Sequence, residues 1–352
     1  MYNPGVPMPA LVKYRLAGAI VPILALGFPL PAQAHVKWFA SYDVNQAPNA
    51  LTSIGNLTML GLVAAALVLL WAATRIEQTS LAARCATMLD RVSTLVQGRI
   101  EDFLRAATAA FFISLWATGG IILTPELKTD SPLIPLLQLA IAGSMFWRST
   151  LPLGAAGIVA LYLCGISAYG LFHMMDYPIF LGLAAYHALS ASPSEVWRAG
   201  RANVLRIGAA ATLMWASVEK LAYPHWTHPL LDAHAGLSLG LDYGQFMIAA
   251  GVVEFSLAFG LLWGPLVRCI SALVLGAMFT AAIFEFGKID AIGHMMIIAI
   301  LVAVLFEPNR EQRGWWIPRL ATCIPVFTYV PALIGTISLY YGSHFVLCAM
   351  SV

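Results

Sequence analysis

The stretch QFMIAAGVVEFSLAFGLLW, from Gln245 to Trp263, contains a single charged residue, Glu254. A helix that crosses the hydrocarbon core of a bilayer needs about 20 consecutive apolar residues, so this stretch is long enough to span a membrane. The whole chain has this character: 60% of its 352 residues are hydrophobic and only 10% are charged, against about 25% charged in soluble domains. The sequence therefore predicts an all-α, polytopic membrane protein whose main partner is the lipid bilayer.

Apolar segments of this kind recur along the chain, and we expect about ten transmembrane helices. The candidate spans are 52–74, 105–124, 133–147, 151–171, 177–191, 204–222, 245–263, 268–286, 291–306 and 318–342. The connection at 75–104 is the longest loop on the inner side, and its pattern favours an amphipathic helix.

The first residues resemble a secretory signal peptide. Lys13 and Arg15 precede a short apolar run, 16–30, and the chain then reads Pro-Ala-Gln-Ala, ending at Ala34. A positive start, a short apolar run and a small-x-small ending are typical of a cleaved signal. We favour cleavage, which leaves His35 as the mature N-terminus, over a retained first helix.

The basic residues predict the orientation. With the mature N-terminus outside, thirteen arginines fall on the inner side, and four lysines, Lys37, Lys128, Lys220 and Lys288, fall on the outer side. Inner loops of membrane proteins carry the excess of basic residues. We therefore expect a bacterial inner-membrane protein with both mature termini in the periplasm. The outer face is predicted to be rich in acids and imidazoles, which suits cations or proton-coupled redox chemistry. The net charge of +2 predicts no nucleic-acid partner.

A weak internal repeat organises the spans. Residues 103–110 resemble 204–211, and the run that begins at Gln138 resembles the run that begins at Gln245. Each repeat holds four spans, and an even number makes the two units parallel. The predicted organisation is a signal peptide at 1–34, an N-terminal segment with the first span and an inner loop at 35–102, four-helix units at 103–191 and 204–306, and a C-terminal span at 307–352.

The second unit resembles the DoxX-like family of four-helix membrane proteins, and 103–191 is a weaker copy of the same pattern. The resemblance rests on Leu205-Arg206, on the run WASVEK at 215–220, on GVVE at 251–254 and on Gly293-His294. The family includes subunits linked to quinone-dependent sulfur oxidation. The resemblance therefore implies redox chemistry at the outer membrane face.

Three residues are candidates for catalysis: Glu254, Glu219 and His294. A charged carboxylate near the bilayer centre costs about 2.5–3.5 kcal/mol on the insertion scale, and ionisable residues there are usually functional. Glu254 could relay protons or accept a hydrogen bond from a quinone hydroxyl. The alternative is a neutral carboxyl that links two helices. We expect the three residues to line one polar pocket between helices.

Three further residues are candidates for cofactor binding: Trp215, His173 and Asp176. Trp215 lies four residues before Glu219, so the two share a helix face. His173 with Asp176, and Asp290 with His294, pair an imidazole with a carboxylate at equivalent places in the two units. A carboxylate can orient such an imidazole, although helix capping by the aspartates is the simpler interpretation.

A candidate metal site lies in the loop at the outer end of the predicted span 204–222. Imidazoles with a carboxylate suit copper or zinc, and a histidine at the N-terminus adds an α-amine as a chelating group. The predicted ligands are His35, His225, His228, Asp232 and His234. An ordinary hydrated loop is the alternative. The five cysteines form no Cys-x-x-Cys pair, so they predict neither a disulfide framework nor covalently attached haem.

The leading hypothesis is a quinone-linked redox subunit that faces the periplasm, with quinone entering from the lipid and a soluble periplasmic redox protein as its partner. A second hypothesis is copper binding, for sensing, delivery or uptake, with a periplasmic metal-carrying protein as partner. A third is a non-catalytic membrane anchor or assembly partner.

Overall fold

Helices form throughout the described part of the chain because apolar segments leave backbone N–H and C=O groups no polar partner except one another. The computed structural model describes residues 36–39, 42–43, 46–238, 240–307 and 324–349, all within the unit Ala32–Val352. The predicted signal peptide and His35 lie outside these residues. Among the described residues the one β feature is an isolated bridge between Ile121 and Lys128.

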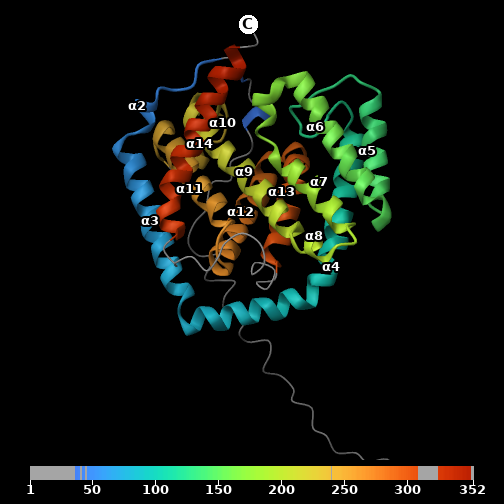
Figure 1. Cartoon of the computed structure of the whole chain (residues 1–352). Helices are drawn as coiled ribbons and strands as arrows, with labels where there is room; N and C mark the ends of the chain where they lie inside the picture. Colours follow the sequence, from blue (N-terminus) through green and yellow to red (C-terminus); the bar gives the residue numbers. More distant parts are fainter. Residues whose placement is uncertain (1–35, 40–41, 44–45, 239, 308–323, 350–352) are drawn as a thin grey trace, which may run out of the picture. The chain divides into compact units, whose positions relative to one another are not determined.

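The elements follow one another as shown in Figure 1. They are η1 (Val36–Trp38), α2 (Leu51–Ile54), α3 (Leu57–Glu77), α4 (Ser80–Thr118), α5 (Leu133–Ser144), η2 (Arg148–Thr150), α6 (Leu151–Met174), α7 (Pro178–Ser190), α8 (Glu195–Ala199), α9 (Arg201–Ala222), η3 (Pro224–Trp226), α10 (His228–Ala233), η4 (Ala235–Ser238), α11 (Tyr243–Gly260), α12 (Pro265–Phe286), α13 (Lys288–Leu305) and α14 (Ile324–Ala349).

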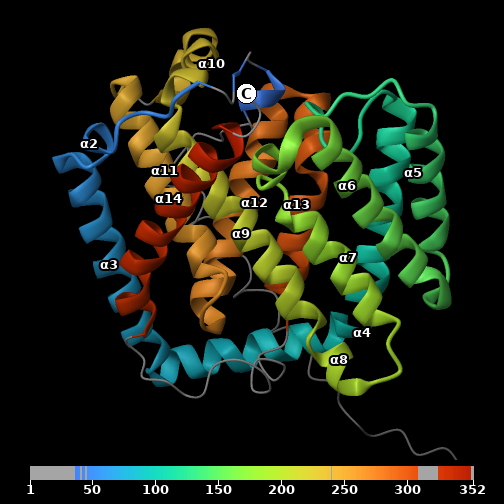
Figure 2. The same ribbon diagram turned by 45° about the horizontal axis from the view of Figure 1, so that its top comes forward.

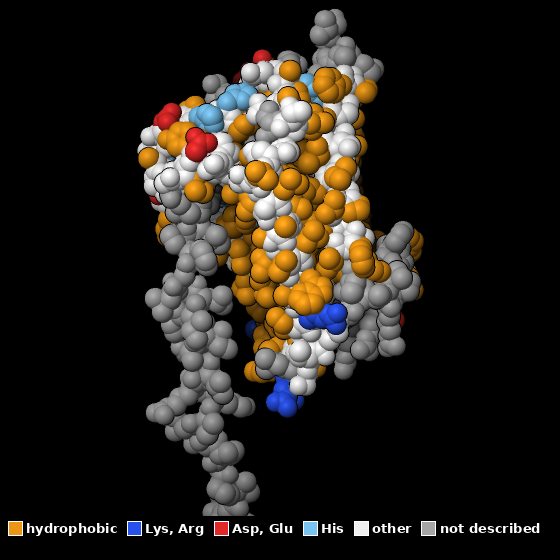
Figure 3. All heavy atoms as spheres, turned by 90° about the vertical axis from the view of Figure 1, so that its left-hand side faces the viewer, with side chains coloured by type: hydrophobic (Ala, Val, Ile, Leu, Met, Phe, Trp, Pro, Cys, Tyr) orange, Lys and Arg blue, Asp and Glu red, His pale blue; other side chains and the backbone are white. Residues whose placement is uncertain are grey.

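Six of these helices are long and apolar enough to cross a membrane, and two more, α5 and α7, are apolar but shorter. The six are Leu57–Glu77, Arg148–Met174, Tyr243–Gly260, Pro265–Phe286, Lys288–Leu305 and Ile324–Leu347. Figure 3 shows apolar side chains over the middle of one face, basic side chains at one end, and histidines and acids at the other. The structure thus confirms an all-α, membrane-type fold for the described residues, while the count of ten spans stays a prediction.

The helix α4 differs from its predicted form. We expected a loop helix and then a separate span beginning at Arg105, but one helix runs continuously from Ser80 to Thr118. Its first half lies across the base of the other helices (Figure 1). Thr79 begins the helix by accepting a hydrogen bond from the backbone N–H of Ala82. Gly119, at φ 74°, ends it, because a left-handed backbone is easily adopted only by glycine.

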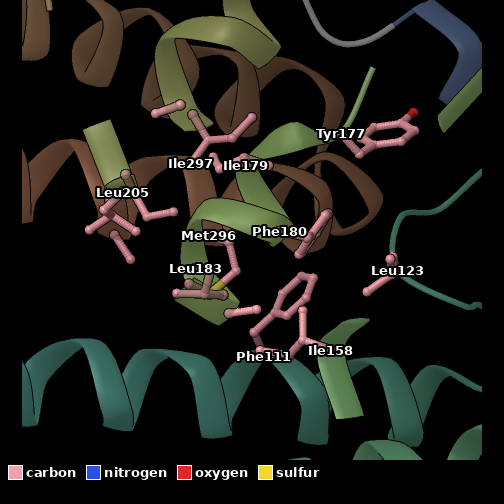
Figure 4. Close-up of a cluster of buried hydrophobic side chains, with 14 of the residues drawn as sticks. Phe111, Leu123, Ile158, Tyr177, Ile179, Phe180, Leu183, Leu205, Met296 and Ile297 are labelled. Carbon is pink, nitrogen blue, oxygen red and sulfur yellow. The ribbon is translucent and has the colours of Figure 1, made fainter. Parts of the chain in front are cut away.

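The two predicted four-helix units share one core. The first helix of each unit packs against the fourth helix of the other: α4 against α13, and α9 against α7. Figure 4 shows Phe111 of α4, Phe180 of α7 and Met296 of α13 among the side chains that meet there. The rings of Phe111 and Phe180 stack with their centroids 5.8 Å apart. Side chains from both units therefore form one apolar interior.

Equivalent places in the two units carry equivalent details. The third helix of each unit breaks at a glycine in the left-handed region, Gly170 at φ 82° and Gly287 at φ 76°. At the other end, Arg148 donates to the carbonyl oxygen of Ser190 at 2.7 Å, and Arg268 donates to that of Glu307 at 2.8 Å. Both arginines thus bind the end of the fourth helix of their own unit. The duplication itself stays a prediction.

The contact between α7 and α9 depends on two glycines that face each other. A Cβ atom on Gly208 would lie 3.0 Å from the Cα atom of Gly182 and 3.1 Å from the carbonyl oxygen of Pro178. These are backbone atoms, so the helices would have to move apart. Small residues allow this close approach of helices in membranes.

We expect Gly208→Ala to destabilise the protein by about 1–3 kcal/mol, the usual cost of overpacking. Thermal unfolding in nanodiscs measures the effect. Gly276→Ala in α12 is the matched control, because a Cβ atom there meets nothing within 4 Å. Equal unfolding temperatures for the two variants would show that the glycine contact does not hold α7 against α9.

Candidate functional site

The most unusual side chain of the structure is a lysine buried among acids. Lys37 belongs to η1, and its side chain is only 3% exposed. Its Nζ donates to Oδ2 of Asp176 at 2.5 Å and also forms an ion pair with Oε2 of Glu219. Asp176 lies in the link between α6 and α7, and Glu219 lies in the last turn of α9. A single ammonium therefore joins the N-terminal segment to both predicted units.

Aromatic rings complete the surroundings of this ammonium. The Nζ of Lys37 lies 5.6 Å from the ring centroid of Tyr42 and 5.5 Å from that of Trp226. Trp226 is held in place by Tyr223, whose parallel ring stacks on it at 4.0 Å. A cation over an aromatic face gains about 0.5–2 kcal/mol, more when water is excluded. We call Asp176, Glu219, Tyr42 and Trp226 the ammonium cage.

The charge of Lys37 is stable in this cage. Burial alone lowers the pKa of a lysine, but the carboxylates of Asp176 and Glu219 outweigh it and raise the pKa of Lys37 above its usual range. Burial raises the pKa of Asp176, and the ammonium groups of Lys37 and Lys220 oppose that rise. We infer that Lys37 carries its proton throughout the physiological pH range and that the acids around it are the groups that titrate.

A second ion pair adjoins the first. Lys220, next to Glu219 in α9, places its Nζ 2.7 Å from Oε2 of Glu254 in α11. Both side chains are largely buried, at 14% and 6% exposed. The two helices can come this close because Gly251 has no side chain. A Cβ atom there would lie 2.9 Å from the carbonyl oxygen of Ser217. Lys220 thus supplies the positive charge that makes a carboxylate at this depth tolerable.

His294 pairs with Asp290, as the sequence spacing suggested. Its Nδ1 lies 2.8 Å from Oδ2 of Asp290, and both side chains are fully buried. The imidazole lies between the ring of Trp38, at 4.8 Å, and the ring of Phe279, at 4.7 Å. Gly293 makes room for Trp38, since a Cβ atom there would collide with the indole. The two neighbouring residues of η1 therefore contact different buried groups: Lys37 binds the acids Asp176 and Glu219, and Trp38 packs on the imidazole of His294.

The three predicted catalytic residues are all buried, but each has a different partner: Glu219 pairs with Lys37, Glu254 with Lys220 and His294 with Asp290. Two of the three therefore belong to lysine ion pairs, and the third is hydrogen-bonded within its own helix. The two lysine partners were missed because an ion pair between residues far apart in the chain leaves no local pattern; Lys37 and Asp176 are 139 residues apart.

The predicted cofactor-binding residues lie around the cage. His173 was predicted to pair with Asp176. In the structure Asp176 binds Lys37. The imidazole of His173 packs against the rings of Tyr42, at 5.6 Å, and Tyr169, at 5.5 Å. Trp215 is buried with its ring 4.7 Å from that of Tyr340 in α14. These aromatic contacts close the apolar side of the cage.

The predicted metal ligands are not brought together. His225 lies 3.1 Å from the side-chain oxygen of Gln46, His234 lies 2.5 Å from a carboxylate oxygen of Glu285, and His228 packs against Tyr243. Asp232 also interacts with Tyr243. Over the described ranges, no group of three His, Cys, Asp or Glu side chains is close enough to hold a metal ion. His35 is not among the described residues.

Glu126 adds a further buried acid next to the cage. It lies in the loop between α4 and α5, is 8% exposed, and accepts a hydrogen bond from Oγ1 of Thr124 at 3.0 Å. Burial raises its pKa to about 7, while hydrogen bonds and the charge of Lys37 oppose the rise. Burial, with the charge of Glu126 as a further cause, raises the pKa of Tyr42 to about 12. No sequence pattern marked Glu126.

Figure 2 shows η1, in blue, at the same end of the unit as α10, which is the predicted outer face.

Comparison with known proteins does not identify the chain: no family model, curated protein or solved structure matches it. The buried ion pairs are therefore the features from which a function has to be inferred.

Glu126 predicts a pH dependence of stability. Its pKa is higher in the folded chain, about 7, than in an unfolded one, about 4.3, so folding favours the protonated form. Its contribution to stability is fully present below pH 4.3 and declines as the pH rises to about 7. We expect Glu126→Gln to flatten the stability profile between these values. Unfolding of both proteins in nanodiscs at a series of pH values tests this, and parallel profiles would contradict it.

Proposed function

We propose that this membrane protein couples proton transfer at its outer face to the redox chemistry of a quinone-type molecule. The observation that carries the proposal is the excess of acid in the buried cluster. Three carboxyl groups, those of Asp176, Glu219 and Glu254, face two ammonium groups, those of Lys37 and Lys220.

That imbalance favours an exchangeable proton. If all five groups were ionised, the cluster would hold an uncompensated negative charge away from water, which is costly. One proton bound among the three carboxyl groups removes this charge. Lys220 links the two ion pairs electrostatically, since its charge acts on Asp176 as well as binding Glu254. A proton can therefore be shared within the cluster instead of belonging to one residue.

Such a cluster suits quinone chemistry. Reduction of a quinone takes up two electrons and two protons, and oxidation of the quinol releases them. A buried acid with an exchangeable proton can supply or accept one of these protons. The molecule would reach the cluster from the lipid, and the electrons would come from or go to a soluble redox protein at the outer face. The resemblance to the DoxX-like family points to the same theme.

The other two hypotheses have less support. Copper handling requires the predicted donors to converge. Among the described ones, His225 contacts Gln46, His234 contacts Glu285, and His228 and Asp232 both contact Tyr243. An anchoring role gives no reason for the burial of Glu254 and Lys220. The proton-coupled role uses these groups directly.

Binding of a short-chain quinol to protein in nanodiscs, followed by quenching of tryptophan fluorescence, tests the proposal. We expect saturable binding to the wild type whose affinity changes with pH. Glu254→Gln removes one of the three carboxyl groups of the cluster and should weaken binding at least tenfold, about 1.4 kcal/mol. Asp130→Asn, an acid exposed on the outer loop, is the control and should bind like the wild type. Lack of saturable binding to the wild type, or equal binding by Glu254→Gln, would refute the proposal.

A further inference from the structure

The ammonium cage has the composition of a receptor site for a cation. Its two carboxylates come from residues that are more than nine-tenths buried, Asp176 at 4% and Glu219 at 7% exposed. Its two aromatic faces, from Tyr42 and Trp226, lie at nearly equal distances from the bound nitrogen. Carboxylates and aromatic faces together form the usual surroundings of a bound ammonium group.

The cation in the cage belongs to a short segment at the edge of the fold. We call Val36–Phe39 the strap. Besides Lys37, its contacts are made by side chains: Trp38 packs on His294, and the ring of Phe39 lies 5.3 Å from that of Phe286. The carboxylates of the cage and Trp226 come from the α6–α7 link, α9 and η3, which are positioned by the helix core. The acidic half of the site is therefore built without the strap, and the strap supplies the cation.

We propose that the cage is a binding site for small primary alkylamines, and that the side chain of Lys37 fills it as an intramolecular ligand. A free amine and the strap then compete for the same two carboxylates. Because only one ammonium fits between them, binding of an amine is linked to withdrawal of the strap. The inference does not depend on quinone chemistry, since it follows from the cage alone.

Truncating the side chain of Lys37 removes the ammonium group that fills the cage. In Lys37→Ala the atoms beyond Cβ are missing, and these correspond to propylammonium. The variant leaves two buried carboxylates without their cation, which destabilises the fold. Propylammonium can restore both the charge and the volume, whereas in the wild type the amine must first displace the side chain of Lys37.

The experiment measures unfolding temperatures in nanodiscs with increasing propylammonium. We expect Lys37→Ala to unfold at a lower temperature than the wild type and to recover saturably with the amine. Wild type and Lys288→Ala, an exposed lysine on the same face, should respond only at far higher amine concentrations, because in both the amine must displace Lys37. Lys37→Met should not respond, because its side chain occupies the space without a charge. Neither 1-propanol nor tetramethylammonium should rescue Lys37→Ala, because neither combines this shape with N–H donors.

Two outcomes would overturn the site: no response of Lys37→Ala, or the same response in Lys37→Met. If Lys37→Ala does not fold alone, the yield of folded protein from cells and buffers with propylammonium replaces the unfolding temperature as the readout. For the wild type, competition predicts that propylammonium speeds acetylation of Lys37 relative to Lys288, measured by mass spectrometry. An unchanged ratio would show that the strap does not exchange with free amines.

Discussion

A carboxylate removed from water is tolerated only when a cation or a proton neutralises it. One end of this protein holds Asp176, Glu219 and Glu254 in that condition. Lys37 and Lys220 supply two of the three positive charges needed, and the positions of the α6–α7 link, α9 and α11 must all satisfy these contacts at once. The same constraint explains why the short segment Val36–Phe39 is held against the α6–α7 link and α9, which are far from it in the sequence.

The two ends of the helices handle charge in different ways. At the basic end, Arg206 and Arg268 both pair with Glu307, and Arg201 pairs with Glu101. There arginines are in excess, and several bind backbone carbonyls at helix ends, as the Arg268 contact with Glu307 does. At the acidic end, carboxyl groups are in excess over lysines. Bound protons can make up that difference, which is why the proposed proton-coupled chemistry is placed at this end.

Much of the fold follows from local pattern. Apolar runs predicted helices close to α3, α6, α11, α12 and α13. The spacing of Asp290 and His294, one helical turn apart, predicted a contact that the structure contains. The depth of Glu254 singled it out as costly, although its neutralising partner was not foreseen.

The rest depended on contacts between distant residues. Lys37 looked like an ordinary lysine before the first span, and only the folded chain brings Asp176 and Glu219 to it. His225, His228 and His234 are close in sequence, but the turns at η3 and α10 point them toward different neighbours. Most of the predicted loop at 75–104 belongs to α4, because after Ser80 nothing interrupts the helix before Gly119. Histidines close together in the sequence thus suggested a metal site that the described residues do not form. The ammonium cage was not predicted, because its residues lie far apart in the sequence.

The central claim, that Lys37 is buried as a cation between two acids, is tested most directly by competitive acetylation of the folded wild-type protein from its outer side. Peptide mass spectrometry compares Lys37 with Lys128 and Lys288, which are exposed. The account predicts that Lys37 reacts far more slowly than both in the folded protein and at a similar rate after unfolding. Equal reaction rates in the folded protein would contradict it.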